Sequence, residues 1–516
     1  MTAFLDSIGY GSWILHVLVL LPLVGLPLIL LAPERMAKHL AMVIATLEFV
    51  LSLGLWWHFD PAAGMQYRSS FSWMPQWGIS YSVGMDGTSL VMVLLTTLLG
   101  PVSVLGSYRY ITRRERAFYC LLLAMVTAMV GCFIALDLFV FYVFFELMLI
   151  PMYFLIGIWG GTRRLYAAIK FFVYTFLGSL LMLVAIVVLV WKVAAVTGRI
   201  SFAYDDVLQH ISAAGDAAPW LFGAFALAFA IKVPIFPLHT WLPDAHTEAP
   251  TAGSVMLASV MLKIGTYGFI RFAVPLFPSV ALSPAISALI VVLAVIGIVY
   301  GALVAMVQPD FKRLVAYSSV SHLGFVMLGI WGLTLQSVQG ALMVMIAHGL
   351  STGALFLLIG MLYERRHSRD IAAFGGIARS VPILSLLLTL VAFSSIGLPG
   401  LNGFIGEFLV LLGSYGRYPW ATGIATTVVI FAAAYLLWAI GRMIYGKVDK
   451  PENETMHDLS LRELIVLAPL VLGIVWMGLY PAPLLRRTEG SARQLIEYAQ
   501  PGRSSAINPA GVEVQP

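Results

Sequence analysis

The sequence predicts an all-α polytopic membrane protein with about fourteen transmembrane helices. Of its 516 residues 60% are hydrophobic, and only 11% are charged, whereas a typical soluble domain has about 25% charged residues. Long apolar runs recur along the whole chain, and they reach the ~20 residues that a helix needs to cross the hydrocarbon core. Composition and run length together therefore exclude an ordinary soluble fold.

The apolar runs can be placed one by one against this length. The connections at Asp137 and at 308–313 are short, so the helices on either side of each are expected to be antiparallel. The run at 382–413 is too long for one straight crossing, and its glycines and Pro399 predict a broken helix. The predicted spans are 13–31, 40–57, 88–107, 117–136, 138–159, 166–190, 219–237, 251–273, 284–306, 314–331, 338–361, 382–413, 420–441 and 463–480.

A faint internal repeat links the seventh and twelfth spans. Pro234 interrupts the seventh and Pro399 interrupts the twelfth, an offset of 399 − 234 = 165 residues. Because five spans separate them, the two units would have opposite directions in the membrane, the inverted topology of many transporters. A coincidence is the alternative, since proline is common in membrane helices. A buried charge near each break, Lys232 and Glu407, favours the repeat.

The basic residues gather in alternate loops, as the positive-inside rule requires. This distribution predicts that both termini lie outside the cytoplasm. Arg486 and Arg487, after the last span, are mildly against the rule. The loops predicted to be cytoplasmic carry Arg35, Lys38, Arg109–Arg116, Arg163, Arg164, Lys312, Arg313, Arg365, Arg366, Arg369, Arg379, Arg442, Lys447, Lys450 and Arg462.

Four ionisable residues lie inside the apolar runs: Glu146, Lys232, Lys263 and Glu407. Each costs roughly 2.5–3.5 kcal/mol at membrane depth even on the lenient insertion scale. A chain keeps such residues when they are paired, hydrated or used, so the passage of protons or ions is the first hypothesis. A carboxylate at Glu146 near Lys232 would keep the lysine charged, and its withdrawal would release a proton. The alternative is a structural ion pair that locks two helices.

Lys263 is in the middle of its span and has no obvious carboxylate nearby in the sequence. His322 and His348 follow it in the tenth and eleventh spans, before Glu407. A lone membrane histidine usually makes a structural hydrogen bond, yet these two could connect Lys263 to Glu407.

Other polar residues receive less specific expectations. Lys170 is close to a basic loop and is expected to extend to the interface. Glu48 is alone in the second span and stays unassigned. Asp244, His246 and Glu248 precede the eighth span, where a loop and helix cap are expected rather than a metal site.

The sequence predicts no redox centre on this chain. Cys120 and Cys132 are twelve residues apart in one predicted helix, roughly 18 Å, which is too far for a disulfide. Two cysteines cannot supply the four ligands of an iron–sulfur cluster. No dinucleotide fingerprint or metal-spaced His/Cys cluster is present. We therefore expect no cofactor and no metal.

Four segments resemble the antiporter-like membrane subunits of respiratory complex I, the NADH:quinone oxidoreductase. The resemblance extends over nearly the whole chain. Glu407 stands where the sister chains L and N, and cation/proton antiporter subunits, typically carry lysine, and the chain ends without the long lateral helix of chain L. The segments are FELMLIPMYFLIGIW (145–159), KVPIFPLHTWLPDAHTEAPTAGS (232–254), DFKRLVAYSSVSHLG (310–324) and GLPGLNGFIGEF (397–408).

The resemblance implies two inverted five-helix repeats, spans four to eight and nine to thirteen, with helices 7 and 12 broken. It divides the chain into N-terminal helices at 1–110, a first repeat at 111–275, a second at 276–445, and helix 14 with the tail at 446–516. It also implies a proton relay with Glu146 and Lys232 as a switching pair, Lys263 at the centre, His322 and His348 along a hydrated path, and Glu407 as the terminal site.

The same resemblance implies partners and a location. The chain would lie between chains L and N in a bacterial inner membrane, and NADH, FMN, Fe–S clusters and quinone would bind to other subunits. A cation/proton antiporter subunit, or one of a membrane-bound hydrogenase, is the first alternative. A purely structural membrane scaffold is the second, and it would tolerate a neutral residue at Lys263. No nucleic-acid partner is expected.

Overall fold

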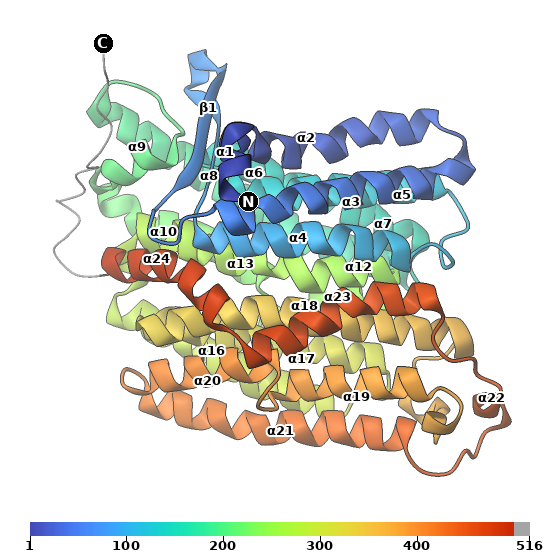
Figure 1. The fold of residues 1–516 in the computed structure, drawn as a ribbon. Helices are drawn as coiled ribbons and strands as arrows, with labels where there is room; N and C mark the ends of the chain where they lie inside the picture. Colours follow the sequence, from blue (N-terminus) through green and yellow to red (C-terminus); the bar gives the residue numbers. More distant parts are fainter. Residues whose placement is uncertain (500–516) are drawn as a thin grey trace.

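The computed structural model describes residues 1–499, which form a bundle of roughly parallel and antiparallel helices (Figure 1). Thirteen helical segments of this part are long and apolar enough to cross a membrane. Two shorter helices, α19 (Pro382–Ile396) and α20 (Asn402–Tyr415), form the broken twelfth span. Thirteen spans and this broken one make fourteen crossings, so the predicted fold class is confirmed. The last residues of the 446–516 segment are outside the described residues.

The helices of the crossings follow the predicted order. Besides the broken twelfth span, two spans are composed of successive short helices, at 138–159 and 251–276. The crossings are α2 (Tyr10–Leu31), α3 (Glu34–His58), α4 (Gly87–Gly106), α5 (Glu115–Ile134), α6 (Leu138–Leu147) with α7 (Leu149–Trp159), α8 (Arg164–Thr197), α10 (Ala218–Lys232), α12 (Thr251–Met256) with α13 (Leu262–Gly268) and α14 (Val274–Leu276), α16 (Pro284–Met306), α17 (Phe311–Gly332), α18 (Leu335–Arg366), α19 with α20, α21 (Pro419–Ile444) and α23 (Leu461–Leu479). The shorter elements are α1 (Thr2–Ser7), α9 (Tyr204–Gln209), α11 (Trp241–Glu248), α15 (Pro278–Ala281), α22 (Pro451–Glu454), α24 (Ala482–Tyr498), β1 (Gln66–Met74) and β2 (Ile79–Met85).

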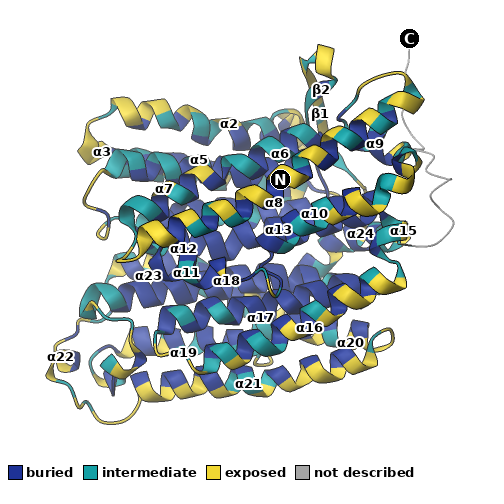
Figure 2. Cartoon of the chain, turned by 180° about the vertical axis from the view of Figure 1, so that it is seen from behind, coloured by how far each residue is buried: buried dark blue, intermediate teal, exposed yellow. Residues whose placement is uncertain are grey.

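Burial divides the crossings into inner and outer helices (Figure 2). The most apolar stretches of the 251–276 segment and of α18 are wholly buried, and that of α17 nearly so. Those of α2, α3 and α21 are less than half buried, and most of their exposed side chains are apolar, as a lipid-facing surface requires. Lys263, His322 and His348 are on the three inner segments, so the protein itself shields them from lipid.

Several elements lie outside the predicted spans. β1 and β2 form an antiparallel hairpin, and α11 is helical and largely buried where a loop and cap were expected. α24 follows the last span as an amphipathic helix. These segments are short or rich in polar residues, so a search for apolar runs does not detect them.

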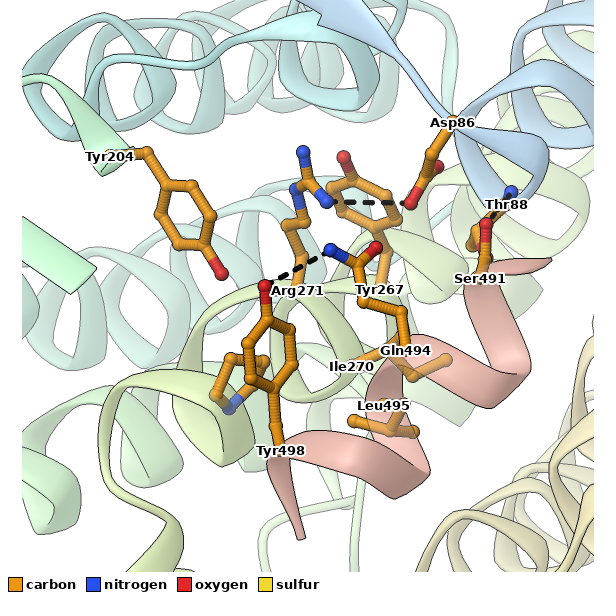
Figure 3. A pocket seen from close by; sticks show the side chains of 11 residues that line it. Asp86, Thr88, Tyr204, Tyr267, Ile270, Arg271, Ser491, Gln494, Leu495 and Tyr498 are labelled. Atoms are coloured by element: carbon orange, nitrogen blue, oxygen red, sulfur yellow. Dashed lines mark hydrogen bonds and ion pairs between the residues drawn. The ribbon is translucent and has the colours of Figure 1, made fainter. Parts of the chain in front are cut away.

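α24 docks through a buried polar cluster at one end of the bundle (Figure 3). Arg271 donates to Asp86 at 3.3 Å, and both side chains are 8% exposed. The Thr88 amide donates to Ser491 of α24 at 3.2 Å. Burial raises the pKa of the Tyr498 phenol, so this end of α24 faces Arg271 as a neutral hydroxyl. The cluster fixes α24 across the ends of α4 and α14.

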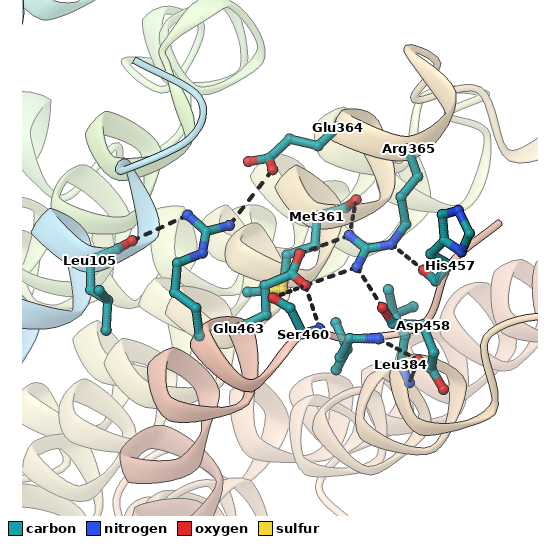
Figure 4. Close-up of polar contacts among 11 residues, drawn as sticks. Leu105, Met361, Glu364, Arg365, Leu384, His457, Asp458, Ser460 and Glu463 are labelled. Carbon is teal, nitrogen blue, oxygen red and sulfur yellow. Dashed lines mark hydrogen bonds and ion pairs between the residues drawn. The ribbon is translucent and has the colours of Figure 1, made fainter. Parts of the chain in front are cut away.

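A second cluster ties the helices at the opposite end (Figure 4). Arg365 of α18 donates to both carboxylate oxygens of Glu463 at 2.8 and 2.9 Å. It also donates to the carbonyls of His457 and Asp458, and the Asp458 carboxylate accepts from the Leu384 amide. One guanidinium therefore joins α18, the start of α23 and, through Asp458, the start of α19.

We predict that Arg365→Gln destabilises the folded subunit. The Glu463 side chain is 3% exposed, and removing one partner of a buried ion pair costs about 3–5 kcal/mol. The amount of assembled complex and its melting temperature should both fall. Arg493→Gln is the matched control, because the pair of Arg493 with Glu489 is exposed and worth about 0–1 kcal/mol. Equal stability of the two variants would contradict the assigned role of Arg365.

Candidate functional site: a buried line of ionisable side chains

Lys263 is at the centre of the bundle, on α13. Two π-helical segments, Leu257–Met261 and Phe269–Ala273, flank this short helix, and such segments are frequent at functional sites. Nζ of Lys263 donates to the carbonyl of Ala258 at 2.5 Å and is hydrogen bonded to Nδ1 of His348 at 2.6 Å. The lysine is fully buried. Its partner is therefore a titratable side chain of α18, the type of neighbour to which it can pass a proton.

The line continues from His348 to Glu407. The ring centres of His348 and His322 are 5.5 Å apart, and Nδ1 of His322 is 2.8 Å from Oε1 of Glu407. A cavity of about 20 Å³ is lined by both rings, by Glu407 and by Ser351. A water molecule needs roughly 10–15 Å³ and two to four polar partners, and this cavity offers both. The cavity therefore has room for a water molecule beside the two histidines.

A network of small polar groups holds the start of α20, the helix that carries Glu407. Asn402, the first residue of α20, accepts from Ser394 of α19 and from Ser351 of α18. Its amide donates to the carbonyl of Ala347 at 3.3 Å. Gly397 ends α19 with φ +84°, a conformation that side chains with a Cβ disfavour. The sequence prediction did not include Asn402, although a polar residue beside Gly397 and Pro399 was an available signal.

Glu146 and Lys232 lie on neighbouring elements without direct contact. Lys232 is the last residue of α10 and is buried, with Nζ 4.7 Å from the ring centre of Phe145. Within residues 1–499 the two residues do not form an ion pair, although Glu146 is close enough to act on the charge of Lys232. The structure therefore places them as electrostatic neighbours separated by more than a hydrogen bond.

The break in the seventh span brings Lys232 close to the helix of Lys263. Trp241 of α11 donates from Nε1 to the carbonyl of Ile231 at 3.0 Å. This hydrogen bond satisfies a backbone carbonyl in the last turn of α10. Gly265, two residues after Lys263, packs directly on this end. A Cβ at Gly265 would come within 2.9 Å of the Val233 amide, so only glycine permits the approach.

His246 and Lys312 are buried polar residues that the sequence did not predict for the site. His246 is on α11, stacked on Phe356, and neither ring nitrogen has a partner within the described part of the chain. Lys263 and Lys312 both act on it electrostatically. Lys312 was placed in a basic loop, but it is 6% exposed and donates to the carbonyl of Ala249 at 2.6 Å. Because Lys312 directly precedes an apolar run, the sequence predicted a loop position for it and not a buried one.

Asp244, in the polar cluster before the eighth span, has a structural role. The expected loop is wrong, because α11 carries Asp244, His246 and Glu248 on a helix. Asp244 accepts from Lys170 at 2.7 Å, so Lys170 is held by an ion pair within the protein instead of extending freely to the interface. Glu48 is fully buried, and its oxygens have no hydrogen-bond partner in residues 1–499.

A multi-pass helical bundle with buried, hydrogen-bonded ionisable side chains defines a class of membrane protein that handles protons or ions within the bilayer. A family model described as NADH:quinone oxidoreductase/Mrp antiporter, TM, matches residues 135–433. The NADH-quinone oxidoreductase subunit M of Rhodobacter capsulatus is 42% identical over 474 residues, which covers 90% of this chain and 91% of the relative. The chain therefore belongs to this family of antiporter-like membrane subunits, as the sequence resemblance predicted.

Solved structures agree with this assignment. A chain of respiratory complex I from Thermus thermophilus superposes with a TM-score of 0.86 at 36% identity, over 94% of this chain and 100% of that one. A chain of the Mrp complex from Dietzia sp. has a TM-score of 0.78 at 24% identity, over 93% of this chain and 52% of that one. At 24% identity, the match with the Mrp complex chain shows only that the two chains share a fold.

We predict that Glu146 and Lys232 are coupled in function. Because their charges interact without a hydrogen bond, exchanging them in the double variant Glu146→Lys/Lys232→Glu should recover part of the activity that either single change removes. The readout is proton pumping by the assembled complex in membrane vesicles, with its expression level measured in parallel. A cycle of Glu146→Gln with Lys170→Gln is the control and should be additive, since Lys170 is paired with Asp244. Additivity in both cycles would show that Glu146 and Lys232 are independent.

Proposed function

We propose that this chain moves protons across the membrane as the M-type subunit of an NADH:quinone oxidoreductase. One observation carries the proposal: the buried line from Lys263 through His348 and His322 to Glu407. Each of these side chains can gain or lose a proton, and the widest gap along the line borders a cavity that accommodates water. Four buried titratable groups in one line exceed what a structural scaffold requires.

Glu146 and Lys232 act at the start of this route. With Glu146 near, Lys232 stays protonated; when the carboxylate moves away or another cation approaches, the lysine loses its proton towards Lys263. His246 lies within electrostatic range of Lys263 and Lys312, so it supplies an additional site on this inner face. These roles rest on the residues' burial and mutual positions.

The energy for transport comes from quinone reduction in partner subunits. We propose that NADH, FMN, Fe–S clusters and quinone bind to those partners and that this chain carries no redox centre. Its immediate neighbours would be the sister chains L and N in a bacterial inner membrane. The basic loops would face the cytoplasm and both termini the periplasm, which follows from the positive-inside rule. Expelling one charge against 100 mV requires roughly 2.3 kcal/mol.

Two features separate this function from that of a cation/proton antiporter subunit. Glu407 provides an acid where antiporter subunits and chains L and N typically carry lysine. The relatives that resemble the chain at about 40% identity over nearly their whole length are named as NADH-quinone oxidoreductase subunits. An acid bound to His322 can release its proton at the exit more readily than a lysine at the same depth.

We predict that Glu407→Gln lowers NADH-driven quinone reduction and proton pumping together. The amide keeps the shape of the side chain but cannot ionise, so a blocked exit stalls the coupled cycle. A loss on the order of tenfold or more is expected for a general acid–base group. Both rates are measured in the same inverted membrane vesicles, at matched levels of assembled complex.

Glu407→Asp is the matched control and should retain most of both activities, because it preserves an ionisable carboxyl group. Full activity in the Gln variant would remove Glu407 from the obligatory route. A loss of activity in both variants to the same extent would indicate that packing, not ionisation, matters at this position.

A further inference from the structure

An apolar groove of about 230 Å³ opens between five helices on one side of the bundle. Apolar side chains line it almost entirely, and their sources are α3, α4, α18, α23 and α24. An apolar cavity of about 150 Å³ already binds a benzene molecule, so a groove of this size has room for an apolar occupant. The lining includes Phe49, Leu53, Trp56, Leu98, Leu350 and Trp476.

The groove has the depth of one lipid leaflet. It begins at Trp56 and Trp476, near the ends of α3 and α23, and extends inward to Phe49. Phe49 is nine residues before the end of α3 at His58, which is roughly 14 Å along the helix axis. Half of the hydrocarbon core is about 15 Å thick. An acyl chain from the adjacent leaflet fits this length.

The mouth of the groove carries positive charge and a pair of tryptophans. The rings of Trp56 and Trp476 pack edge to face at 5.8 Å, in the position that membrane-interface tryptophans prefer. The Arg487 guanidinium lies 3.7 Å from the ring centre of Trp56 and donates to its carbonyl. Arg486 beside it is exposed. These are the two arginines that oppose the positive-inside pattern, and a negatively charged ligand at this mouth would account for them.

We propose that this groove binds one acyl chain of an anionic phospholipid whose phosphate is held at Arg486 and Arg487. The proposal is independent of the proton relay, because it rests on the groove and on the charges at its mouth. The groove also lies close to the buried line of ionisable side chains. Leu95 of the groove wall contacts Gly349, the neighbour of His348. A bound chain therefore keeps hydrocarbon, not water, one residue layer away from the Lys263–His348 hydrogen bond.

A photoreactive lipid tests the proposal on the whole purified complex. The complex is placed in bilayer discs that contain phosphatidylglycerol with a diazirine near the end of one acyl chain, then irradiated, and the labelled residues are identified by peptide mass spectrometry. Labels are expected on α3, α4 and α23 at the groove. Ile430, exposed on the lipid-facing side of α21, gives the background labelling of an ordinary surface.

Two variants with matched controls separate the chain site from the headgroup site. Leu98→Trp fills the groove and should abolish labelling there, whereas Val43→Trp, on the exposed surface of α3, should leave it unchanged. Arg486→Gln should reduce the preference for phosphatidylglycerol over phosphatidylcholine about fivefold, the effect of one basic residue near an anionic lipid. Arg493→Gln, on the same helix but paired with Glu489, should not.

Three results would overturn the proposal. Labelling of the groove no stronger than that of Ile430 would mean that no chain is retained there. Labelling of Ile430 without the groove would mean that another protein segment covers it. Equal labelling by phosphatidylglycerol and phosphatidylcholine would show that the arginines do not recognise an anionic headgroup.

Discussion

The hydrogen bond between Lys263 and His348 is the interaction on which the surrounding structure depends. An ionisable lysine at the centre of a bilayer is costly unless the protein satisfies it, and here the satisfaction comes from one carbonyl and one titratable ring. Lys263 and His348 are on two of the three most deeply buried helical segments, so the protein and not lipid surrounds this contact.

The interruptions of the helices follow from the same constraint. Irregular backbone is tolerated at membrane depth only where protein or water satisfies it. The π-helical turns on either side of Lys263 and the broken α19–α20 span are such places. At the second one the amides of Gly397 and Leu398 donate to the carbonyls of Ser394 and Phe393, and the Asn402 side chain ties the start of α20 to α18 and α19. Regular helices would carry fewer free backbone groups, but they could not bring Lys263, His348 and Glu407 into one line. The interruptions of the helices and the buried ionisable side chains therefore occur at the same places in the bundle.

The crossings and most residues of the buried line of ionisable side chains could be predicted from the sequence. A buried charge in an apolar run is visible without a structure, so Lys263 and Glu407 stood out, and long apolar runs specify crossings by length. Burial of Lys312 and His246 was not predictable, because it results from α11 folding back into the bundle. The distance between Glu146 and Lys232 depends on the angle between α6 and α10, which no local pattern encodes. The hairpin β1–β2 and α24 lie outside the apolar runs.

The rate of proton pumping during NADH oxidation, measured in vesicles with a fully assembled Lys263→Ala complex, tests the central claim most directly. Lys263 is the only lysine that the described hydrogen bonds connect to the histidine–glutamate line, so its loss interrupts the route while the exposed surfaces remain unchanged. The account predicts that most proton pumping disappears although the complex assembles. Near-normal pumping by this variant, at wild-type assembly, would contradict the relay.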